Sequence, residues 1–396
     1  RKEKIMLFSI ALLLLGGMFA GWLCRKLRLP ALLGMILVGV LAGPAVLDLI
    51  DGSILGISSQ LRKIALIIIL SRAGLTLNLE DLKKNGRPAV LMCFVPAAFE
   101  ITGMILLAPV LLPVTRLEAA VMGSVVAAVS PAVIVPKMIK LMEEGYGVRK
   151  GIPQIILAGA SVDDVFVIVL FSAFTSLAQG KEISVISFVN IPVSILLGAV
   201  IGMVLGYALA SYFQRVGVRD AVKLLVFLSV SFLLTAAEGS LHTGITFSGL
   251  IAVMFMGIGL QRKKMDSAKM LSGKFNQMWV FAEVILFTLV GASVDISYVS
   301  SAGLAAVILI FAVLVFRMLG VCLCMAGTKL NWKERIFCML AYMPKATVQA
   351  AIGGLPMAMG LPCGKIVLTV AVLAIFITAP LGAFLIDATY QKLLEG

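Results

Sequence analysis

Residues 152–178 read IPQIILAGASVDDVFVIVLFSAFTSLA, an apolar stretch with two adjacent acids, Asp163 and Asp164, near its middle. The stretch is long enough to cross the hydrocarbon core of a bilayer as one helix. A charged side chain at the bilayer centre costs about 3 kcal/mol on insertion scales, so intramembrane acids usually serve a function. Two carboxyl groups a few Å apart repel each other strongly when both are ionised. We therefore predict that this helix binds protons, cations or both at its aspartate pair.

The rest of the chain has the composition of an integral membrane protein. Of its 396 residues, 61% are hydrophobic and only 13% are charged, and the mean hydropathy is +1.10. Apolar runs of about spanning length recur along the whole chain. They lie near residues 5–23, 30–47, 64–77, 88–111, 118–142, 152–178, 183–213, 222–237, 243–260, 275–296, 302–327, 335–360 and 365–388. The sequence therefore predicts an all-α membrane protein of about thirteen transmembrane helices.

The net charge of +13 follows the predicted membrane topology. Most of the 33 lysines and arginines lie at one end of the predicted helices, in the loops that share a side with the C-terminus. Cytoplasmic loops are the ones enriched in positive charge. We therefore expect a multi-pass protein of the plasma membrane, surrounded by lipid, with its N-terminus outside and its C-terminus in the cytoplasm. A basic charge placed in this way argues against nucleic acid as a partner.

Metal-ligating side chains show no recognisable pattern. The six cysteines lie in or beside apolar segments without a CxxC spacing, and the one histidine is His242. Such cysteines are typical small core residues. We therefore expect no disulfide, no resident metal and no cofactor.

Two predicted helices are interrupted by proline at corresponding places in the two halves of the chain. Residues 130–136 read SPAVIVP, and residues 343–347 read MPKAT. The second of these helices lies seven predicted helices after the first and crosses the membrane in the opposite direction. This relation indicates an inverted repeat, and two ordinary proline kinks are the alternative. Freed backbone groups at membrane depth are tolerated only where protein or a wet cavity satisfies them. We therefore predict that both breaks border the binding site. The predicted supporting residues are Ser130, Pro131, Lys345 and Thr347.

One of the two adjacent aspartates is predicted to face a bound cation such as Na⁺, and the other to face the interrupted helices. Successive residues of a helix point about 100° apart, so Asp163 and Asp164 cannot make the same contact. A hard cation prefers oxygen ligands, which carboxylates, hydroxyl groups and freed backbone carbonyls supply. The hydroxyl candidates are Ser130, Ser161 and Thr347. Cation and proton would compete for one carboxylate, and that competition couples their opposing fluxes.

Three further ionisable residues lie at membrane depth. Glu100 and Arg317 stand midway along corresponding predicted helices, so we predict that they form a buried ion pair, either for function or for structure alone. Lys345 follows the proline of the second break. It can neutralise the end of a half-helix, pair with Asp163, or extend to the cytoplasmic interface.

Other polar and small residues allow two interpretations each. Glu283 is either a further titratable group or a hydrogen-bond partner of Asn276 or Thr288. Glycines spaced by four residues favour close helix packing, at a dimer interface or within the chain. These are Gly198, Gly202 and Gly206, and also Gly17 and Gly21.

Two strings of sequence closely resemble one known family. They are AVSPAVIVPKMIKLMEEGYGVRKGIPQIILAGASVDDV at residues 128–165 and PKATVQAAIGG at residues 344–354. Together they resemble the NHA-type sodium/proton antiporters of the cation:proton antiporter superfamily, over roughly residues 85–390. The resemblance implies an NhaA-like fold, with a dimerisation domain and a core in which two broken helices cross.

The resemblance also implies roles for single residues. It makes Asp164 the ion-binding carboxylate, Asp163 its neighbour, and Glu100 with Arg317 an intramembrane pair. Many relatives have a lysine at the position of Arg317, where it pairs with the first aspartate. The arginine here departs from that pattern, so the pairing and the number of protons exchanged stay open.

These observations predict a secondary active antiporter, not an enzyme, that exchanges Na⁺ and Li⁺ for protons by elevator-like alternating access. Residues 88–178 and 302–388 would form the translocation core, and residues 1–47 and 183–260 the scaffold of a homodimer. Exchange of K⁺ for protons is the alternative. An intramembrane aspartyl protease is disfavoured because a GxGD-like motif is missing, and a channel is disfavoured by the broken helices and the Glu100–Arg317 pair.

Overall fold

The computed structural model describes residues 2–27, 29–76, 86–179, 185–217, 219–240, 247–294 and 296–396. Every regular element within these residues is an α-helix, which confirms the all-α prediction. In chain order the helices are α1 (Lys2–Lys26), α2 (Ala31–Ala42), α3 (Gly52–Gly56), α4 (Ser58–Thr76), α6 (Gly86–Met92), α7 (Val95–Leu111), α8 (Arg116–Val126), α9 (Pro131–Glu144), α10 (Ile152–Ala178), α11 (Val185–Arg215), α12 (Asp220–Ser240), α13 (Gly249–Lys263), α14 (Met265–Ala292), α15 (Ile296–Cys324), α16 (Trp332–Ala341), α17 (Thr347–Ile352), α18 (Leu355–Ala358) and α19 (Gly364–Leu393).

Each predicted span overlaps at least one of these helices. Within the described residues, nine helical segments are long and apolar enough to cross a membrane. Helix α2 is apolar but shorter, and α4 has several basic residues, so neither belongs to the nine. The chain is thus a multi-pass membrane protein, and the count of thirteen helices stays a prediction.

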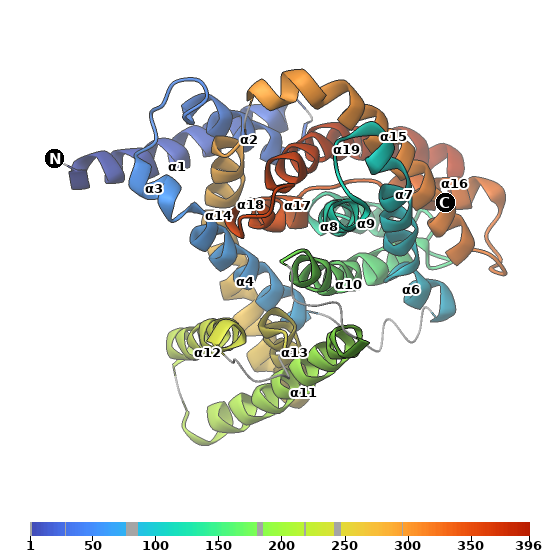
Figure 1. The fold of residues 1–396 in the computed structure, drawn as a ribbon. Helices are drawn as coiled ribbons and strands as arrows, with labels where there is room; N and C mark the ends of the chain where they lie inside the picture. The colour runs from blue at the N-terminus through green and yellow to red at the C-terminus, as the bar shows by residue number, and fades with distance from the viewer. Residues whose placement is uncertain are drawn as a thin grey trace. The chain divides into compact units, whose positions relative to one another are not determined.

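The chain divides into two compact units (Figure 1). The first comprises Arg1–Arg62, Leu79–Gln179 and Val284–Gly396, and the second comprises Lys63–Asn78 and Gly180–Glu283. The predicted core segments at 88–178 and 302–388 both belong to the first unit, as does the scaffold segment at 1–47. A division into moving core and static scaffold concerns motion, so it stays a prediction.

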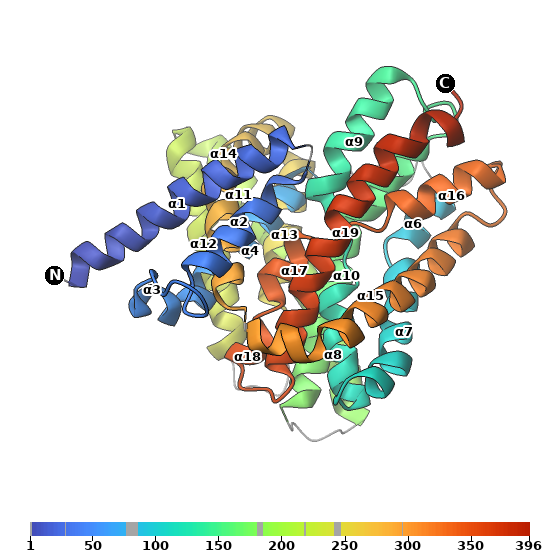
Figure 2. The ribbon, with the colours of Figure 1, turned by 90° about the horizontal axis from the view of Figure 1, so that it is seen from above.

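In the first unit, both interrupted helices are visible as pairs of half-helices. Helices α8 and α9 flank a break at residues 127–130, and α16 and α17 flank a second break at residues 342–346. Helix α10 packs against α8 and α9, and α19 runs along α8, α9 and α16 (Figure 2). Buried apolar side chains of α9, α10, α16 and α19 form one core beside the breaks.

Local sequence explains where these half-helices begin and end. Helix α8 begins with a capping box in which the side chains of Thr115 and Glu118 each accept a backbone N–H of the first turn. Helix α9 begins at Pro131, whose fixed φ and missing N–H suit the first helical position. It ends at Glu144, and the glycine that follows, Gly145, caps it with a left-handed φ of 88°.

A third interruption was not predicted from the sequence. The span expected at residues 88–111 is split into α6 and α7, which are separated by Cys93 and Phe94. The hydroxyl of Tyr342 donates a hydrogen bond to the Met92 carbonyl at this split, with 3.0 Å between the oxygens. Pro96 lies in the first turn of α7 and has no N–H to continue a ladder from α6.

One end of the first unit is held by a lysine outside the spanning segments. Lys150, in the loop between α9 and α10, lies 2.9 Å from the Glu334 carboxylate and 3.1 Å from that of Glu395. Glu334 belongs to the first turn of α16, and Glu395 follows α19. Hydrogen bonds to Glu334, then to Glu395, raise the pKa of Lys150. The lysine therefore joins the loop to the ends of two other helices.

In the second unit, the glycine stripe of α11 packs against α13. A side chain at Gly198, Gly202 or Gly206 would collide with backbone carbonyls of α13 or of its N-cap, and at Gly202 the nearest is Ala252 O at 2.2 Å. Gly17 and Gly21 likewise face residues of their own unit. These glycines therefore serve packing within the chain, and the homodimer prediction has to rest on other surfaces.

Candidate ion-binding site

The two helix breaks touch each other in the first unit. The backbone N–H of Ser130, in the first break, donates to the carbonyl of Pro344, in the second, at 2.8 Å. This direct contact joins the break between α8 and α9 to the break between α16 and α17. The proline-interrupted segments that the sequence places in separate halves of the chain therefore build one site.

Side chains bind the carbonyls that the first break frees. The Gln349 amide nitrogen donates to Val126 O at 2.9 Å and to Ala128 O at 2.7 Å. Ala127 O accepts from the Arg317 guanidinium and from the Lys345 ammonium. Positive groups are favourable here because the C-terminal end of a helix has partial negative charge. These three carbonyls are thus hydrogen-bonded to side chains of the protein.

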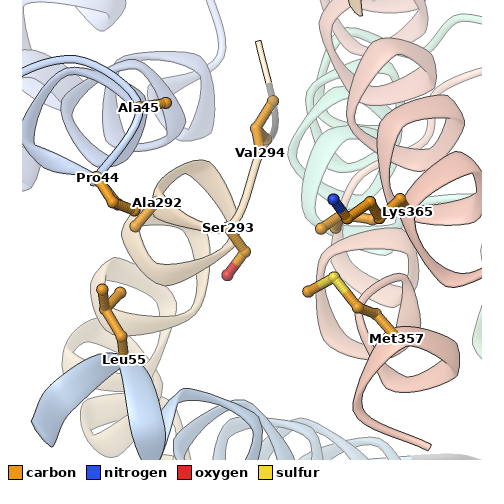
Figure 3. A pocket seen from close by; sticks show the side chains of 9 residues that line it. Pro44, Ala45, Leu55, Ala292, Ser293, Val294, Met357 and Lys365 are labelled. Carbon is orange, nitrogen blue, oxygen red and sulfur yellow. The ribbon is translucent and has the colours of Figure 1, made fainter. Parts of the chain in front are cut away.

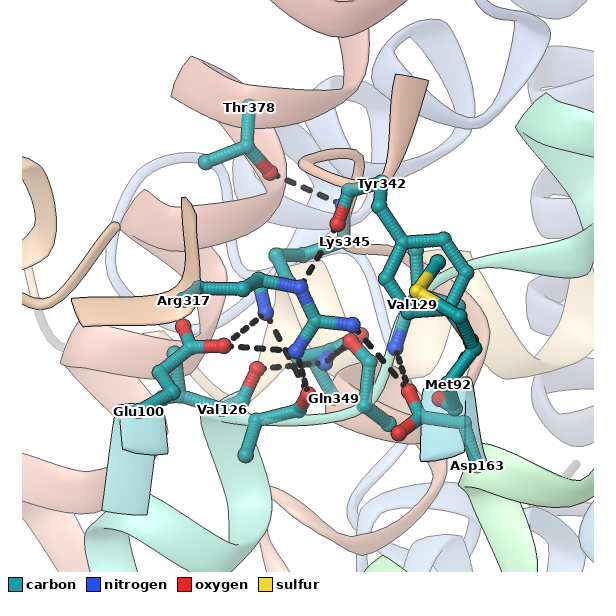
Figure 4. A network of polar contacts seen from close by, with 12 residues as sticks. Met92, Glu100, Val126, Val129, Asp163, Arg317, Tyr342, Lys345, Gln349 and Thr378 are labelled. Carbon is teal, nitrogen blue, oxygen red and sulfur yellow. Dashed lines mark hydrogen bonds and ion pairs between the residues drawn. The ribbon is translucent and has the colours of Figure 1, made fainter. Parts of the chain in front are cut away.

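Arg317 is the centre of the buried polar network (Figure 4). Its guanidinium lies 2.8 Å from Glu100 Oε2, 3.2 Å from Asp163 Oδ2 and 2.6 Å from Tyr342 O. Tyr342 is the C-cap of α16, so this one side chain binds the ends of both α8 and α16. The planar fork of arginine suits several acceptors at once. The sequence left open whether Arg317 pairs with the first aspartate, and the contact with Asp163 shows that it does.

Lys345 is fully buried, so an extended conformation toward the cytoplasmic interface is excluded. Its ammonium lies 2.5 Å from Glu100 Oε2 and 3.4 Å from Ala127 O. The contact at Ala127 is at the end of α8, a half-helix of the other break. The backbone N–H of Lys345 donates to Thr378 Oγ1 of α19 at 2.9 Å. Glu100 therefore contacts two positively charged side chains, those of Arg317 and Lys345. Lys345 also neutralises the partial negative charge at the C-terminal end of α8.

The adjacent aspartates of α10 have different environments. Asp163 is fully buried, and its Oδ2 accepts the Val129 N–H at 2.7 Å in addition to the contact with Arg317. Asp164 is 9% exposed. Among the described residues no lysine or arginine forms an ion pair with Asp164, and its Oδ1 has no hydrogen-bond partner. The two carboxylates thus make different contacts, as the helical spacing predicted.

Several oxygens around the crossing have no hydrogen-bond partner within the described parts of the chain. They are Glu100 Oε1, Asp163 Oδ1, Asp164 Oδ1, Ser130 Oγ, Thr347 Oγ1 and Gln349 Oε1. All six belong to buried side chains. Such groups are costly to bury without a partner, so each is suited to bind a cation. The Ser161 side chain lies outside the described residues.

Sequence reasoning missed two members of this site. Gln349 and Tyr342 both contact the breaks, and Gln349 lies within the PKATVQAA string. A polar amide inside an apolar half-helix was the available signal for Gln349. Glu283 belongs to the second unit, near the charge of Arg72.

A separate pocket of about 470 Å³ lies in the first unit (Figure 3). Apolar side chains such as Leu55 and Met357 line it, together with Ser293 and Lys365. None of the residues that form the polar network lines this pocket. The candidate ion-binding site is therefore the buried crossing itself.

Known proteins are similar to this chain in sequence and in fold. Residues 10–391 match the family described as "Sodium/hydrogen exchanger, transmembrane". Sodium/hydrogen exchanger 9B2 from Homo sapiens is 34% identical over 98% of this chain and 75% of its own length. The chain belongs to the sodium/hydrogen exchanger family. Sodium/hydrogen exchanger 9B1 from Homo sapiens is 32% identical over 98% of this chain and 78% of its own length.

The fold of this exchanger-family chain also matches a solved structure. The sodium proton antiporter MjNhaP1 from Methanocaldococcus jannaschii superposes with a TM-score of 0.84 at 21% identity and covers 99% of each chain. At this identity the likeness concerns the fold. The resemblance to cation:proton antiporters that the sequence strings indicated is confirmed by the family match, the relatives and the fold together.

Proposed function

We propose that this protein exchanges Na⁺, and also Li⁺, for protons, with Asp164 as the shared binding group. The charges of the crossing support this proposal. Two buried acids, Glu100 and Asp163, face two buried bases, Arg317 and Lys345, so these four charges balance. Asp164 is the carboxylate for which the described residues offer no ion pair. Its buried charge needs an external partner, which is either a metal cation or a proton.

This requirement produces exchange without a separate coupling device. When Na⁺ leaves, Asp164 becomes an uncompensated buried anion unless a proton replaces the ion. The site with an ionised Asp164 and no bound ion is therefore high in free energy. The site becomes accessible from the other side of the membrane only while it holds Na⁺ or a proton. The unpartnered oxygens of Ser130 and Thr347 complete the coordination of the metal ion.

One proton for each cation is the exchange ratio we propose. Arg317 already balances Asp163, so Asp163 does not need to gain and lose a proton during the cycle. Exchange of one Na⁺ for one proton moves no net charge. A membrane potential should therefore leave the exchange rate unchanged.

Alternating access is proposed to occur by an elevator-like movement. All polar contacts of the crossing come from residues 88–178 and 302–388. These segments can therefore move as one body without breaking the site, while residues 1–47 and 183–260 form the static scaffold. We further propose a homodimer in the lipid of the plasma membrane, with the N-terminus outside and the C-terminus in the cytoplasm, because positive charge collects on the C-terminal side.

Proton flux in proteoliposomes tests the proposal. With an imposed pH gradient, Na⁺ and Li⁺ should dissipate the gradient, and choline should not. A valinomycin-imposed K⁺ potential should not alter the Na⁺ response. Dissipation by K⁺ without a response to Na⁺ would replace the proposed cation, and a voltage-dependent rate would overturn the proposed ratio.

The variant Asp164→Asn keeps the size of the side chain and removes its charge, so exchange should stop while the protein stays folded. Asp387→Asn is the matched control, because Asp387 forms an ion pair with Lys137 at a partly exposed position of α19. The control should exchange at the wild-type rate. Wild-type exchange by Asp164→Asn would exclude Asp164 as the shared group.

A further inference from the structure

Gln349 is held at the crossing in one defined orientation. Its side chain is 1% exposed, and one of its terminal atoms faces two carbonyl oxygens, Val126 O and Ala128 O. Carbonyls only accept hydrogen bonds, so the atom that faces both must be the NH₂ group, which has two protons to donate. The amide oxygen therefore points away from α8. This oxygen, Oε1, has no hydrogen-bond partner among the described residues although it is buried.

The same two hydrogen bonds decide which oxygens remain free at the first break. Val126 O, Ala127 O and Ala128 O are backbone carbonyls at the C-terminal end of α8 and in the first break. Gln349 binds the first and third of them, and Arg317 with Lys345 binds the second. The Val129 N–H, next along the chain, is taken by Asp163. The buried side-chain oxygens without a described partner at the crossing include that of Gln349.

We propose that Gln349 determines the cation selectivity of the site. It offers Oε1 as a ligand and withholds two backbone carbonyls, so that a small set of oxygens on carboxylate, hydroxyl and amide groups faces the ion. This inference rests on the proposed cation site at Asp164. A side chain fixed at two points resists expansion, which favours small cations such as Li⁺ and Na⁺. Rings of backbone carbonyls are the ligands that replace the hydration shell of the larger K⁺.

The decisive variant is Gln349→Met, which has nearly the same length and shape but no amide. It removes Oε1 and releases Val126 O and Ala128 O into the site. The KM values for Li⁺, Na⁺ and K⁺ are measured from proton flux in proteoliposomes. We expect the KM for Li⁺ and Na⁺ to rise roughly tenfold, the loss of about one good ligand interaction, with a smaller rise or a fall for K⁺. The ratio of the Na⁺ and K⁺ values is therefore the readout.

Gln154→Met is the matched control. Gln154 is also a glutamine of the first unit whose side-chain oxygen has no described partner, but it lies at the start of α10, two turns or more from the aspartates. This variant should keep all three KM values. If Gln349→Met does not yield folded protein, Gln349→Asn keeps the amide on a side chain one methylene shorter. It should shift the ratio of KM values in the same direction.

The possible results separate selectivity from a purely structural role. Equal increases of all three KM values, or unchanged values, would overturn the proposal, since loss of packing alone affects every cation alike. A change in the ratio for Gln349→Met but not for Gln154→Met supports it. Failure of the proposed function itself has a different signature. In that case the wild type shows no Na⁺-dependent flux, or Asp164→Asn still exchanges.

Discussion

Removal of Arg317 should destabilise the protein because it leaves the buried Asp163 carboxylate without an ion-pair partner. The variant Arg317→Met keeps most of the apolar stem and deletes the guanidinium. Glu100 then still has Lys345 at 2.5 Å, whereas Asp163 loses its ion-pair partner. Leaving one buried charge uncompensated costs about 3–5 kcal/mol. The carbonyl of Tyr342 also loses a donor at 2.6 Å, which adds about 1–3 kcal/mol.

Thermal unfolding of the purified protein in detergent measures this loss, and the chain offers a matched control. Arg62 is also buried, at 3% exposure, but its described hydrogen bond is a long one of 3.4 Å to Ser58 O, and its Nη1 has no partner. Arg62→Met should therefore cost about 1 kcal/mol or less. The midpoint of unfolding should fall by several degrees more for Arg317→Met than for Arg62→Met.

A second substitution then identifies the charge responsible. Asp163→Asn, added to Arg317→Met, removes the uncompensated carboxylate and should recover about 0.5–3 kcal/mol relative to the sum of the single losses. Glu100→Gln in the same background should recover less, because Lys345 still neutralises Glu100. An Arg317→Met variant that is no less stable than Arg62→Met would contradict this role of Arg317, and so would Asp163→Asn if it adds its full single cost to Arg317→Met.

Three further outcomes follow from the structure. Na⁺ should raise the unfolding temperature of the wild type but not of Asp164→Asn, and equal stabilisation would place the ion elsewhere. Gly202→Leu should lower stability by about 1–3 kcal/mol, because even its Cβ would lie 2.2 Å from Ala252 O, and a wild-type melting curve would contradict this packing. The pKa of Lys150 is raised above its ordinary 10.5 by Glu334 and then Glu395, so its stabilising effect is complete below pH 10.5 and is lost as the pH rises further. Lys150→Met should abolish that part of the alkaline destabilisation in pH-dependent melting, and an unchanged profile would exclude the contact.

Much of the site was predictable because intramembrane charge is rare. Asp163, Asp164, Glu100 and Arg317 stand out in an apolar sequence since each must have a partner or a function at that depth. The partners themselves were less predictable. The sequence offered three roles for Lys345, and burial together with the 2.5 Å contact to Glu100 excludes the exposed one.

An all-α membrane protein with two adjacent acids in one span and two proline breaks was predictable from the sequence, because apolar length, charge placement and proline act locally along the chain. The sequence did not determine which groups satisfy the freed backbone. That depends on the crossing, where Ser130 N meets Pro344 O and where Gln349, Arg317 and Lys345 bind the end of α8. Gln349, Arg317 and Lys345 lie more than 180 positions after α8 in the sequence, so their contacts with the carbonyls at its C-terminal end arise from the meeting of the two breaks and not from any local pattern.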